Sequence, residues 1–269
     1  MKGCEVFVTF SGEGVPLLCL HGWGKAVSSS AFDALRKELE SANVQVIAPN
    51  LPGFGKSAEP PHVWTVDDYA DCMEELIREL GLKNVHLLGH SFGGRIAIKL
   101  AARQGSLRDS AQHDKFWLFH LYLCGAAGLP QRRYLKRFIG HSLAKLGKTF
   151  LAIPGLRALA TPARTLLYKV LREHDYEQAS ERMRETMIKV ISEDLTSYLS
   201  SITVPTDLFW GEEDTMTPLA DGELMNKKIV QSELHVFSGV RHRVHIERAK
   251  EIAEVILQAM HNPSPKGRG

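Results

Sequence analysis

A serine between glycines is the residue whose setting most clearly suggests chemistry. Gly89-His-Ser-Phe-Gly93 directly follows the apolar run 85–89 and opens a helical pattern over 92–104. In a strand-to-helix turn of this kind the serine is exposed on a strained backbone, and small flanking residues let the backbone pack closely. Ser91 is therefore the predicted nucleophile. The backbone N–H of Phe92, immediately after it, is a predicted donor to the oxyanion that forms on attack.

A nucleophilic serine needs a neighbouring base, and the base needs a group that orients it. Two histidines, His242 and His245, follow the last strand-like run. Three acids follow the run before it: Glu212, Glu213 and Asp214. Both groups lie past the carboxyl ends of strands, where open α/β sheets place their sites. Position in the chain alone does not decide which of the two histidines is the base or which of the three acids orients it.

The elements that must position these residues alternate between strands and helices along the chain. Near-continuous apolar runs predict buried parallel strands at 15–20, 44–48, 85–89, 116–124, 204–210 and 233–237. Helical patterns fall at 31–41, 66–80, 92–104, 218–228 and 245–260. This alternation predicts an α/β protein with a doubly wound, mostly parallel sheet.

One long stretch interrupts the alternation. Between 130 and 201 only helical patterns occur, and the strand pattern resumes at Val204. We therefore predict a helical cap, or lid, at 130–201, inserted into a core formed by 1–129 and 202–260. The Pro/Gly-rich end, 261–269, is expected to be a disordered tail.

Five ordered motifs make the sequence similar to the α/β-hydrolase superfamily, in particular to its cap-bearing, serine esterase-like branch. They are His21-Gly-Trp-Gly24, Asn50-Leu-Pro-Gly-Phe-Gly-Lys-Ser57, Gly89-His-Ser-Phe-Gly-Gly94, Trp210-Gly-Glu-Glu-Asp214 and His242-x-x-x-x-Glu247. The resemblance covers about residues 5–258 and implies the α/β-hydrolase fold. One departure is Asn50, where relatives usually carry an aspartate that is structural in most members.

The resemblance also implies roles for residues that position alone leaves open. Aligning Trp-Gly-x-x-Asp places the orienting carboxylate on Asp214, and the spacing of histidine and Glu247 selects His242 as the base. The loop that begins at His21 is expected to supply the second oxyanion donor, the backbone N–H of Trp23. The predicted catalytic group is thus Ser91, His242 and Asp214.

This group implies hydrolysis of a carboxylic ester of a small or medium-sized molecule through an acyl-enzyme, with no cofactor. The same residues could serve a thioesterase, a carbon–carbon bond hydrolase or a cofactor-free perhydrolase. A different class is a hydrolase-like binding protein whose turnover is vestigial. The motifs carry no code for the acyl or alcohol group.

Several other classes are disfavoured by composition. The chain has 33 Lys and Arg against 31 Asp and Glu, a net charge of +2, which argues against a dedicated nucleic-acid binder. Its four cysteines include no Cys-x-x-Cys pair, and no run resembles a signal peptide or a membrane span. A cytoplasmic location is expected. No metal site is predicted, since His242-x-x-His245 is completed by no carboxylate pattern. Nucleotide binding is disfavoured as well, because Asn50 stands where a phosphate-binding loop would need its first glycine.

The predicted cap has an unusual charge distribution. Residues 131–172 contain ten Lys and Arg and no Asp or Glu, interleaved with Leu and Phe at helical spacing. One interpretation is the solvated outer face of an ordinary lid. The other is a weak contact with an anionic membrane surface. The oligomeric state is left open.

Overall fold

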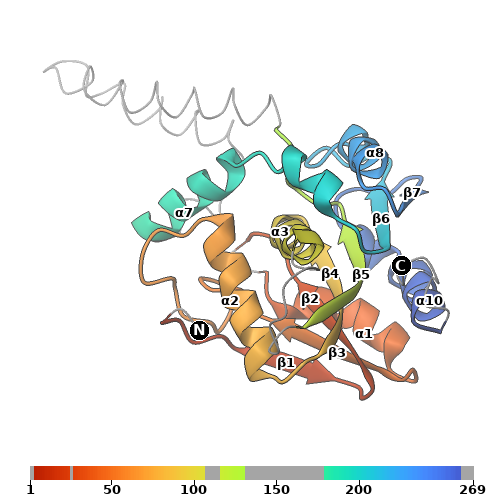
Figure 1. Ribbon diagram of the computed structural model, residues 1–269, viewed down its shortest axis with the longest axis horizontal. Helices are drawn as coiled ribbons and strands as arrows, with labels where there is room; N and C mark the ends of the chain where they lie inside the picture. Colours follow the sequence, from red (N-terminus) through yellow and green to blue (C-terminus); the bar gives the residue numbers. More distant parts are fainter. Residues whose placement is uncertain (1–2, 25–26, 107–115, 131–178, 262–269) are drawn as a thin grey trace, which may run out of the picture.

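The computed structural model describes residues 3–24, 27–106, 116–130 and 179–261, and a seven-stranded sheet forms the centre of this part (Figure 1). The strand order is β1-β3-β2-β4-β5-β6-β7. β1 pairs antiparallel with β3, and the other neighbouring pairs are parallel. The strands are β1 (Val8–Ser11), β2 (Val15–Leu20), β3 (Val44–Pro49), β4 (Asn84–His90), β5 (Trp117–Cys124), β6 (Thr206–Gly211) and β7 (Ser232–Phe237).

Helices cover both faces of this sheet. α2, α3 and α8 pack on one face, and α1 and α10 pack on the other. The helical segments are η1 (Ser29–Phe32), α1 (Asp33–Leu39), α2 (Val66–Glu79), α3 (Phe92–Ser106), α7 (Glu181–Ser192), η2 (Thr196–Ser201), α8 (Leu219–Lys228), α9 (Val244–Glu247) and α10 (Ala249–His261). The predicted doubly wound α/β architecture is confirmed.

The central strands are apolar because both of their faces are buried. In β4, Leu87 packs with α2 and α3, whereas Leu88 packs with α1 and α10. β6 alternates in the same way, with Leu208 in the first layer and Phe209 in the second. A strand enclosed on both sides needs apolar residues at successive positions, which explains the continuous runs in the sequence.

One strand was not predicted, and two predicted helices differ from those observed. β1 was not predicted, because this short edge strand is only partly buried and has no continuous apolar run. The helix predicted at 245–260 is divided into α9 and α10, since Arg248 has φ −127° and ψ 36°, outside the helical region. The helix predicted at 31–41 begins as the 3-10 segment η1 and ends at Leu39.

The described part of the predicted cap is helical and is attached to the core. In α7, Arg182 donates to the Pro60 carbonyl at 2.9 Å, and Thr186 Oγ1 accepts from the Trp64 N–H at 3.1 Å. The basic stretch 131–172 and the tail after His261 lie outside the described residues. The cap boundaries 130 and 201 therefore stay a prediction. In the part of the chain that the structure describes, no helix is long and apolar enough to cross a membrane.

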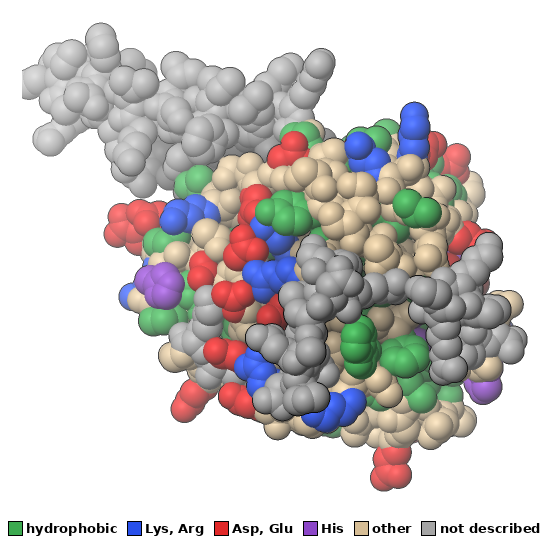
Figure 2. All heavy atoms as spheres, in the orientation of Figure 1, with side chains coloured by type: hydrophobic (Ala, Val, Ile, Leu, Met, Phe, Trp, Pro, Cys, Tyr) green, Lys and Arg blue, Asp and Glu red, His purple; other side chains and the backbone are tan. Residues whose placement is uncertain are grey.

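Charges on the surface of α2 and α3 are paired. Arg103 contacts the carboxylates of Asp67, Asp71 and Glu74 at 2.8 to 3.0 Å. Figure 2 shows acidic and basic side chains interspersed on the face that it draws. These pairs hold α2 against α3, the helix that begins immediately after Ser91.

Candidate active site

Ser91 lies on a sharp turn between β4 and α3. Its φ is 51°, and it is the single non-glycine residue with positive φ in the described part of the chain. A side chain in this left-handed region costs of order 1–3 kcal/mol, so the surrounding structure must hold it there. Ser91 N–H donates to the Cys124 carbonyl at 3.2 Å, and the Ser91 carbonyl accepts from Gly94 and Ala127 at 3.0 Å. Backbone contacts with the end of β5, with the segment that follows it and with the first turn of α3 thus hold the turn.

The glycines around Ser91 are required by close backbone contacts. A Cβ atom at Gly89 would lie 2.6 Å from the Gly93 carbonyl oxygen. A Cβ at Gly93 would lie 2.0 Å from the Leu20 carbonyl oxygen, far inside van der Waals contact. Both positions must therefore be glycine for α3 to begin where it does.

Asp214 and His242 meet beyond the carboxyl end of the sheet. His242 Nδ1–H donates to Asp214 Oδ2 at 2.8 Å. The other Asp214 oxygen accepts from the backbone N–H groups of Met216 and Thr217 at 2.8 and 3.0 Å, and the Thr217 hydroxyl donates to Oδ2 at 2.8 Å. Burial raises the pKa of Asp214, but the hydrogen bonds from His242 and Thr217 outweigh it and lower the pKa below its ordinary value. Asp214 is therefore ionised and fixed, as an orienting carboxylate must be.

Several contacts bring His242 and Ser91 to the same place. His90, the residue before Ser91, donates from Nε2 to the His242 carbonyl at 3.1 Å. A Cβ at Gly125 would lie 3.2 Å from Asp214 Oδ2 and 3.4 Å from His242 Nδ1, which places the end of β5 beside this pair. Because Nδ1 carries the proton donated to Asp214, Nε2 of neutral His242 is free to accept one. The transfer from Ser91 to His242 stays a prediction.

His245, the alternative base, lies in a different environment. It is 1% exposed, in α9, and its ring lies 3.8 Å from the ring of His90 and 5.6 Å from that of Phe32. Burial, with the nearby His242 and Arg243, lowers its pKa to about 3. A neutral ring enclosed by other side chains has no access to substrate. This arrangement favours His242, whose side chain is 13% exposed.

The alternative acids also lie elsewhere. Glu212 is exposed and accepts from the Ser238 hydroxyl at 2.7 Å. Glu213 is exposed, 3.8 Å from Arg241. Glu247, which helped to select His242 in the sequence, is exposed on α9. Asp214 alone among the three acids after β6 contacts His242 in the described structure.

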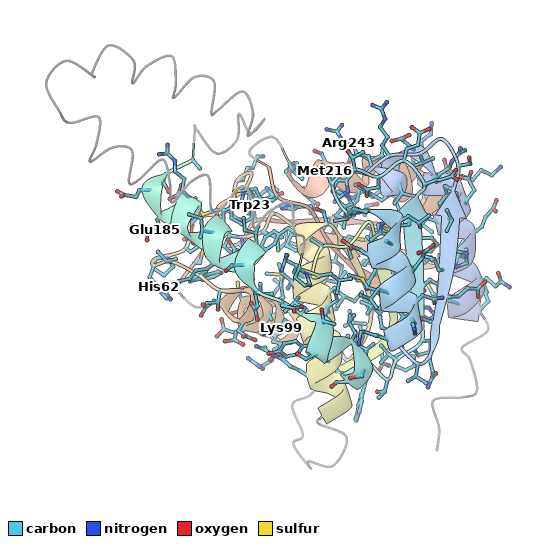
Figure 3. All side chains as sticks on the ribbon, turned by 90° about the horizontal axis from the view of Figure 1, so that it is seen from above. Trp23, His62, Lys99, Glu185, Met216 and Arg243 are labelled. Atoms are coloured by element: carbon cyan, nitrogen blue, oxygen red, sulfur yellow. The ribbon has the colours of Figure 1, made fainter. Side chains whose placement is uncertain are left out.

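The two predicted oxyanion donors are the backbone N–H groups of Trp23 and Phe92, whose side chains lie next to each other. Phe92 is the first residue of α3, so its N–H lies in the first turn, where amides have no partner within the helix. Trp23 follows β2, and its ring lies 5.0 Å from the Phe92 ring. In the view of Figure 3, Trp23 lies between α7 and the loops that carry Met216 and Arg243. Both donor roles stay predictions.

Two histidines that the sequence did not single out hold the site loops together. His21 is fully buried; its Nε2 accepts from the Leu51 N–H at 2.9 Å, and its Nδ1–H donates to the Gly22 carbonyl at 2.7 Å. Burial lowers the pKa of His21 to about 4, so it stays neutral in this arrangement. Burial likewise lowers the pKa of His90 well below its ordinary value. His21 belongs to the motif His21-Gly-Trp-Gly24 and His90 to Gly89-His-Ser-Phe-Gly-Gly94. Membership of these motifs was the sequence signal that could have identified them.

Comparisons with known proteins agree with this architecture. Residues 17–255 match the model of the Alpha/beta hydrolase family. The chain is 28% identical over 266 residues to the AB hydrolase superfamily protein YisY of Bacillus subtilis, with 94% of each chain covered. It is 27% identical over 249 residues to a non-heme haloperoxidase of Rhodococcus erythropolis, covering 89% of this chain and 90% of that one. The solved esterase EaEST of Exiguobacterium antarcticum superposes with a TM-score of 0.70 at 24% identity, covering 97% of each chain.

The fold and the family match lead to one conclusion. This chain belongs to the alpha/beta hydrolase family, as its motifs predicted. The relatives support hydrolase activity. The bond that is cleaved and the residues that cleave it are matters for proposal.

Proposed function

We propose that this protein is a serine hydrolase that cleaves a carboxylic ester of a small or medium-sized molecule through an acyl-enzyme. The observation that carries the proposal is the Asp214–His242 hydrogen bond beside the strained turn of Ser91. A buried, ionised carboxylate that fixes one nitrogen of a histidine leaves the other nitrogen as a base. This is the arrangement that activates a serine hydroxyl.

Acylation follows from these positions. Ser91 Oγ attacks the ester carbonyl carbon while its proton passes to His242 Nε2. The carbonyl oxygen becomes an oxyanion, which accepts hydrogen bonds from the backbone N–H groups of Trp23 and Phe92. The intermediate collapses, the C–O bond of the ester breaks, and the leaving alcohol takes the proton from His242. The acyl group stays on Ser91.

Deacylation uses the same groups in reverse. A water molecule gives a proton to His242 Nε2 and attacks the acyl carbon, forming a second oxyanion at the same donors. Collapse breaks the bond to Ser91 Oγ, which regains the proton from His242, and the carboxylic acid leaves. Asp214 keeps its charge throughout and stabilises the imidazolium in both steps.

The surroundings of Ser91 favour an apolar acyl group. The Trp23 ring lies 4.9 Å from that of Phe54 and 5.0 Å from that of Phe92, and the Tyr69 ring lies 4.9 Å from that of Phe92. Met183 of α7 lies against Gly53, next to this aromatic cluster. Binding pockets for small molecules are mostly lined by such side chains.

A second candidate is perhydrolysis, in which hydrogen peroxide replaces water in deacylation and a peracid is formed. The relative named a non-heme haloperoxidase favours it, because its similarity covers nine tenths of that protein. The same serine, histidine and carboxylate would serve both reactions. The two differ in the second nucleophile and not in the acyl-enzyme.

Ser91→Ala tests the nucleophile. We expect kcat on nitrophenyl esters to fall by about 10⁴–10⁶, with the far-UV circular dichroism and the melting temperature close to those of the wild type. A fluorophosphonate probe should label the wild type and not the variant. Retention of more than a tenth of the activity, or equal labelling of both proteins, would refute the assignment.

A substrate panel tests the bond. Nitrophenyl esters of graded chain length, acyl thioesters and a vinylogous 1,5-diketone should be compared by kcat/KM, with and without hydrogen peroxide. We expect esters to be the best substrates, with a preference for an apolar acyl chain. A higher kcat/KM for the thioester or the diketone, or peracid formation faster than hydrolysis, would replace the proposed reaction with that alternative.

A further inference from the structure

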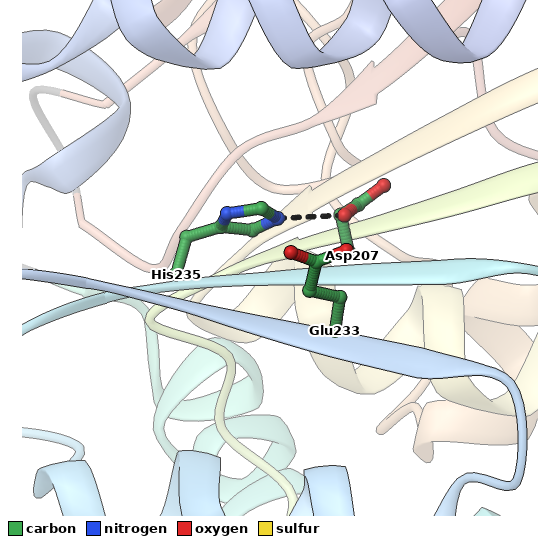
Figure 4. A group of neighbouring side chains, drawn as sticks. All are labelled: Asp207, Glu233 and His235. Carbon is green, nitrogen blue, oxygen red and sulfur yellow. Dashed lines mark hydrogen bonds and ion pairs between the residues drawn. The ribbon is translucent and has the colours of Figure 1, made fainter.

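A second cluster of polar side chains lies on the α10 side of the sheet, away from Ser91. Asp207 of β6 accepts from two imidazoles: His235 Nε2 on Oδ1 and His120 Nε2 on Oδ2, both at 2.7 Å. Possible ligand atoms of Asp207, Glu233 and His235 all lie within 4.8 Å of one another. Figure 4 shows the carboxylates of Glu233 and Asp207 next to the imidazole of His235.

Aromatic packing fixes the orientation of both imidazoles. His235 stacks on Phe209, with ring centroids 5.0 Å apart and 19° between the planes. His120 stacks on Tyr122 at 4.6 Å and 17°. The rings therefore present Nε2 to Asp207 without a further loss of side-chain freedom, which is the preorganisation that a ligand site needs.

The cluster has an excess of negative charge. Asp and Glu are ionised at neutral pH in ordinary surroundings, so Asp207 and Glu233 contribute two negative charges. Among the described residues neither carboxylate forms an ion pair with a lysine or an arginine; Asp207 instead accepts hydrogen bonds from His120 and His235. A divalent cation would neutralise the two carboxylates.

We propose that Asp207, Glu233 and His235 form a divalent metal site that takes Zn²⁺. The ion would be held by Asp207 Oδ1, the Glu233 carboxylate and His235 Nε2, and water would complete its shell. Mixed nitrogen and oxygen ligands suit zinc, whereas magnesium prefers oxygen alone. To bind the metal, Nε2 of His235 must be unprotonated, so the ligating imidazole is neutral and carries its one proton on Nδ1; an imidazolium would release its second proton to solvent.

His120 acts as a positioning residue in this site. It donates to the Asp207 oxygen that faces away from His235, and so holds the carboxylate in the orientation the metal needs. Ligating carboxylates are commonly held by a hydrogen bond of this kind. Atoms around a tetrahedral zinc lie about 3.3–3.6 Å apart, so the His235–Asp207 contact must open by less than about 1 Å.

The site is too far from Ser91 to take part in acyl transfer. Asp207 lies four residues before the end of β6, which is about 13 Å along the strand. β7 pairs only with β6 in the described sheet, and the metal would tie these two strands together. We therefore expect zinc to stabilise this edge of the sheet and to leave ester hydrolysis nearly unchanged.

The direct test is zinc binding by the whole protein, prepared without a histidine tag and treated with a chelator. Titration calorimetry with ZnCl₂ should give one site per chain, and MgCl₂ should bind at least 100-fold more weakly. A zinc concentration 100-fold above Kd should raise the melting temperature by about 5–10 °C. All four cysteines are buried, so thiols do not compete for the ion in the folded protein.

Two ligand variants and one control locate the site. Glu233 is exposed, so Glu233→Gln should fold normally yet weaken zinc binding tenfold or more. His235→Gln keeps a donor toward Asp207 and should have the same effect. His120→Gln should weaken binding by about 10–100-fold. His62→Gln, at an exposed histidine outside the cluster, should leave it unchanged.

Failure to bind zinc below 1 mM would overturn the proposal and leave the cluster as hydrogen-bonded support for the sheet. Zinc affinity unchanged in both Glu233→Gln and His235→Gln would overturn it as well, because the ion would then bind elsewhere.

Discussion

At the scale of single residues, the environment separates His242 from His245. The two stand three positions apart and both follow β7. His242 has its Nδ1 held by a buried carboxylate and its side chain partly exposed, whereas the ring of His245 is enclosed against His90 and Phe32. One histidine is therefore placed to exchange protons with substrate, and the other is placed to fill the core.

This difference predicts opposite results for two substitutions. His242→Ala should lower kcat by about 10⁴ or more, as the loss of Ser91 does, because acyl transfer then lacks the base that takes the proton from Ser91. His245→Leu should keep more than a third of the wild-type kcat, since its ring nitrogens have no hydrogen-bond partner among the described residues. Steady-state kinetics on one nitrophenyl ester checks both. The reverse ranking would move the base to His245.

Wild-type kcat/KM should also fall on acidification, because protonated His242 cannot act as a base. Asp214→Asn should lower kcat heavily as well, because it removes the charge that stabilises the imidazolium.

At the scale of elements, the turn between β4 and α3 depends on the contact of α3 with β2. Gly93 N–H donates to the His21 carbonyl at 3.0 Å, and its Cα hydrogen occupies the space where a side chain would meet β2. This contact fixes Ser91 relative to the loop of Trp23. The same glycine therefore sets both the start of the helix and the position of the predicted oxyanion donors.

Gly93→Ala should damage the fold together with the site. The added methyl would lie 2.0 Å from the Leu20 carbonyl oxygen, so β2 and α3 must separate, at a cost of about 3 kcal/mol or more. In a chain of this size that loss lowers the melting temperature by about 6–12 °C. Calorimetry measures it.

Gly81→Asn is the matched control for this substitution. Its φ is +66° and its Cβ would meet nothing within 4 Å, and asparagine tolerates that conformation. We expect a change below about 1 kcal/mol. Gly93 is not among the residues with positive φ, so its backbone conformation does not require glycine. Equal destabilisation by both substitutions would therefore refute the special importance of the contact with β2.

At the scale of the whole molecule, buried neutral histidines couple stability to pH. Burial lowers the pKa of His21 and His86 to about 4 and that of His245 to about 3, and it lowers the pKa of His90 well below its ordinary value. The unfolded chain binds protons on these residues below about pH 6.5. The folded chain does not bind them until the pH is well below 5. The contribution of His235 to the pH dependence of stability has the opposite sign, because its hydrogen bond to Asp207 raises its pKa.

The free energy of unfolding should therefore be highest above pH 7 and should decrease as the pH falls from about 6.5 to 4. Each buried histidine contributes up to about 1.4 kcal/mol per pH unit, so a net slope of at least about 2 kcal/mol per unit is expected. Urea unfolding at several pH values measures it. His245→Leu should flatten the slope, and His62→Ala, an exposed position, should not. A stability independent of pH over this range would contradict the prediction.

The basic stretch 131–172 supplies a second prediction at this scale. Each Lys or Arg near an anionic bilayer contributes about 1 kcal/mol, screened over roughly 8–10 Å. We expect weak cosedimentation with vesicles that contain phosphatidylserine, lost at high salt and absent with neutral vesicles. Replacing Arg132, Arg133, Lys136 and Arg137 with Gln should reduce binding and leave small-ester turnover unchanged. Equal binding to both kinds of vesicle, or none at low salt, would leave the stretch as a plain solvated surface.

The sequence by itself determined the fold class, six of the seven strands and the turn at Ser91. Buried parallel strands require continuous apolar residues, and a tight strand-to-helix turn requires glycines at fixed offsets, so both features are local in the chain. β1 escaped prediction because a short, half-exposed edge strand imposes no such pattern. The break between α9 and α10 at Arg248 was not predicted either, because the helical spacing of apolar residues continues across it.

Only the tertiary structure decided which polar residues share a site and which are enclosed. The hydrogen bond from His242 to Asp214 and those made by His21 and His90 join segments that are far apart in the chain. The burial of His245 likewise depends on packing against Phe32 and His90. His120 and Asp207 meet although they are 87 positions apart in the chain. Strand pairing and the packing of helices on the sheet create these contacts, and no local pattern of residue types encodes the distance between two strands.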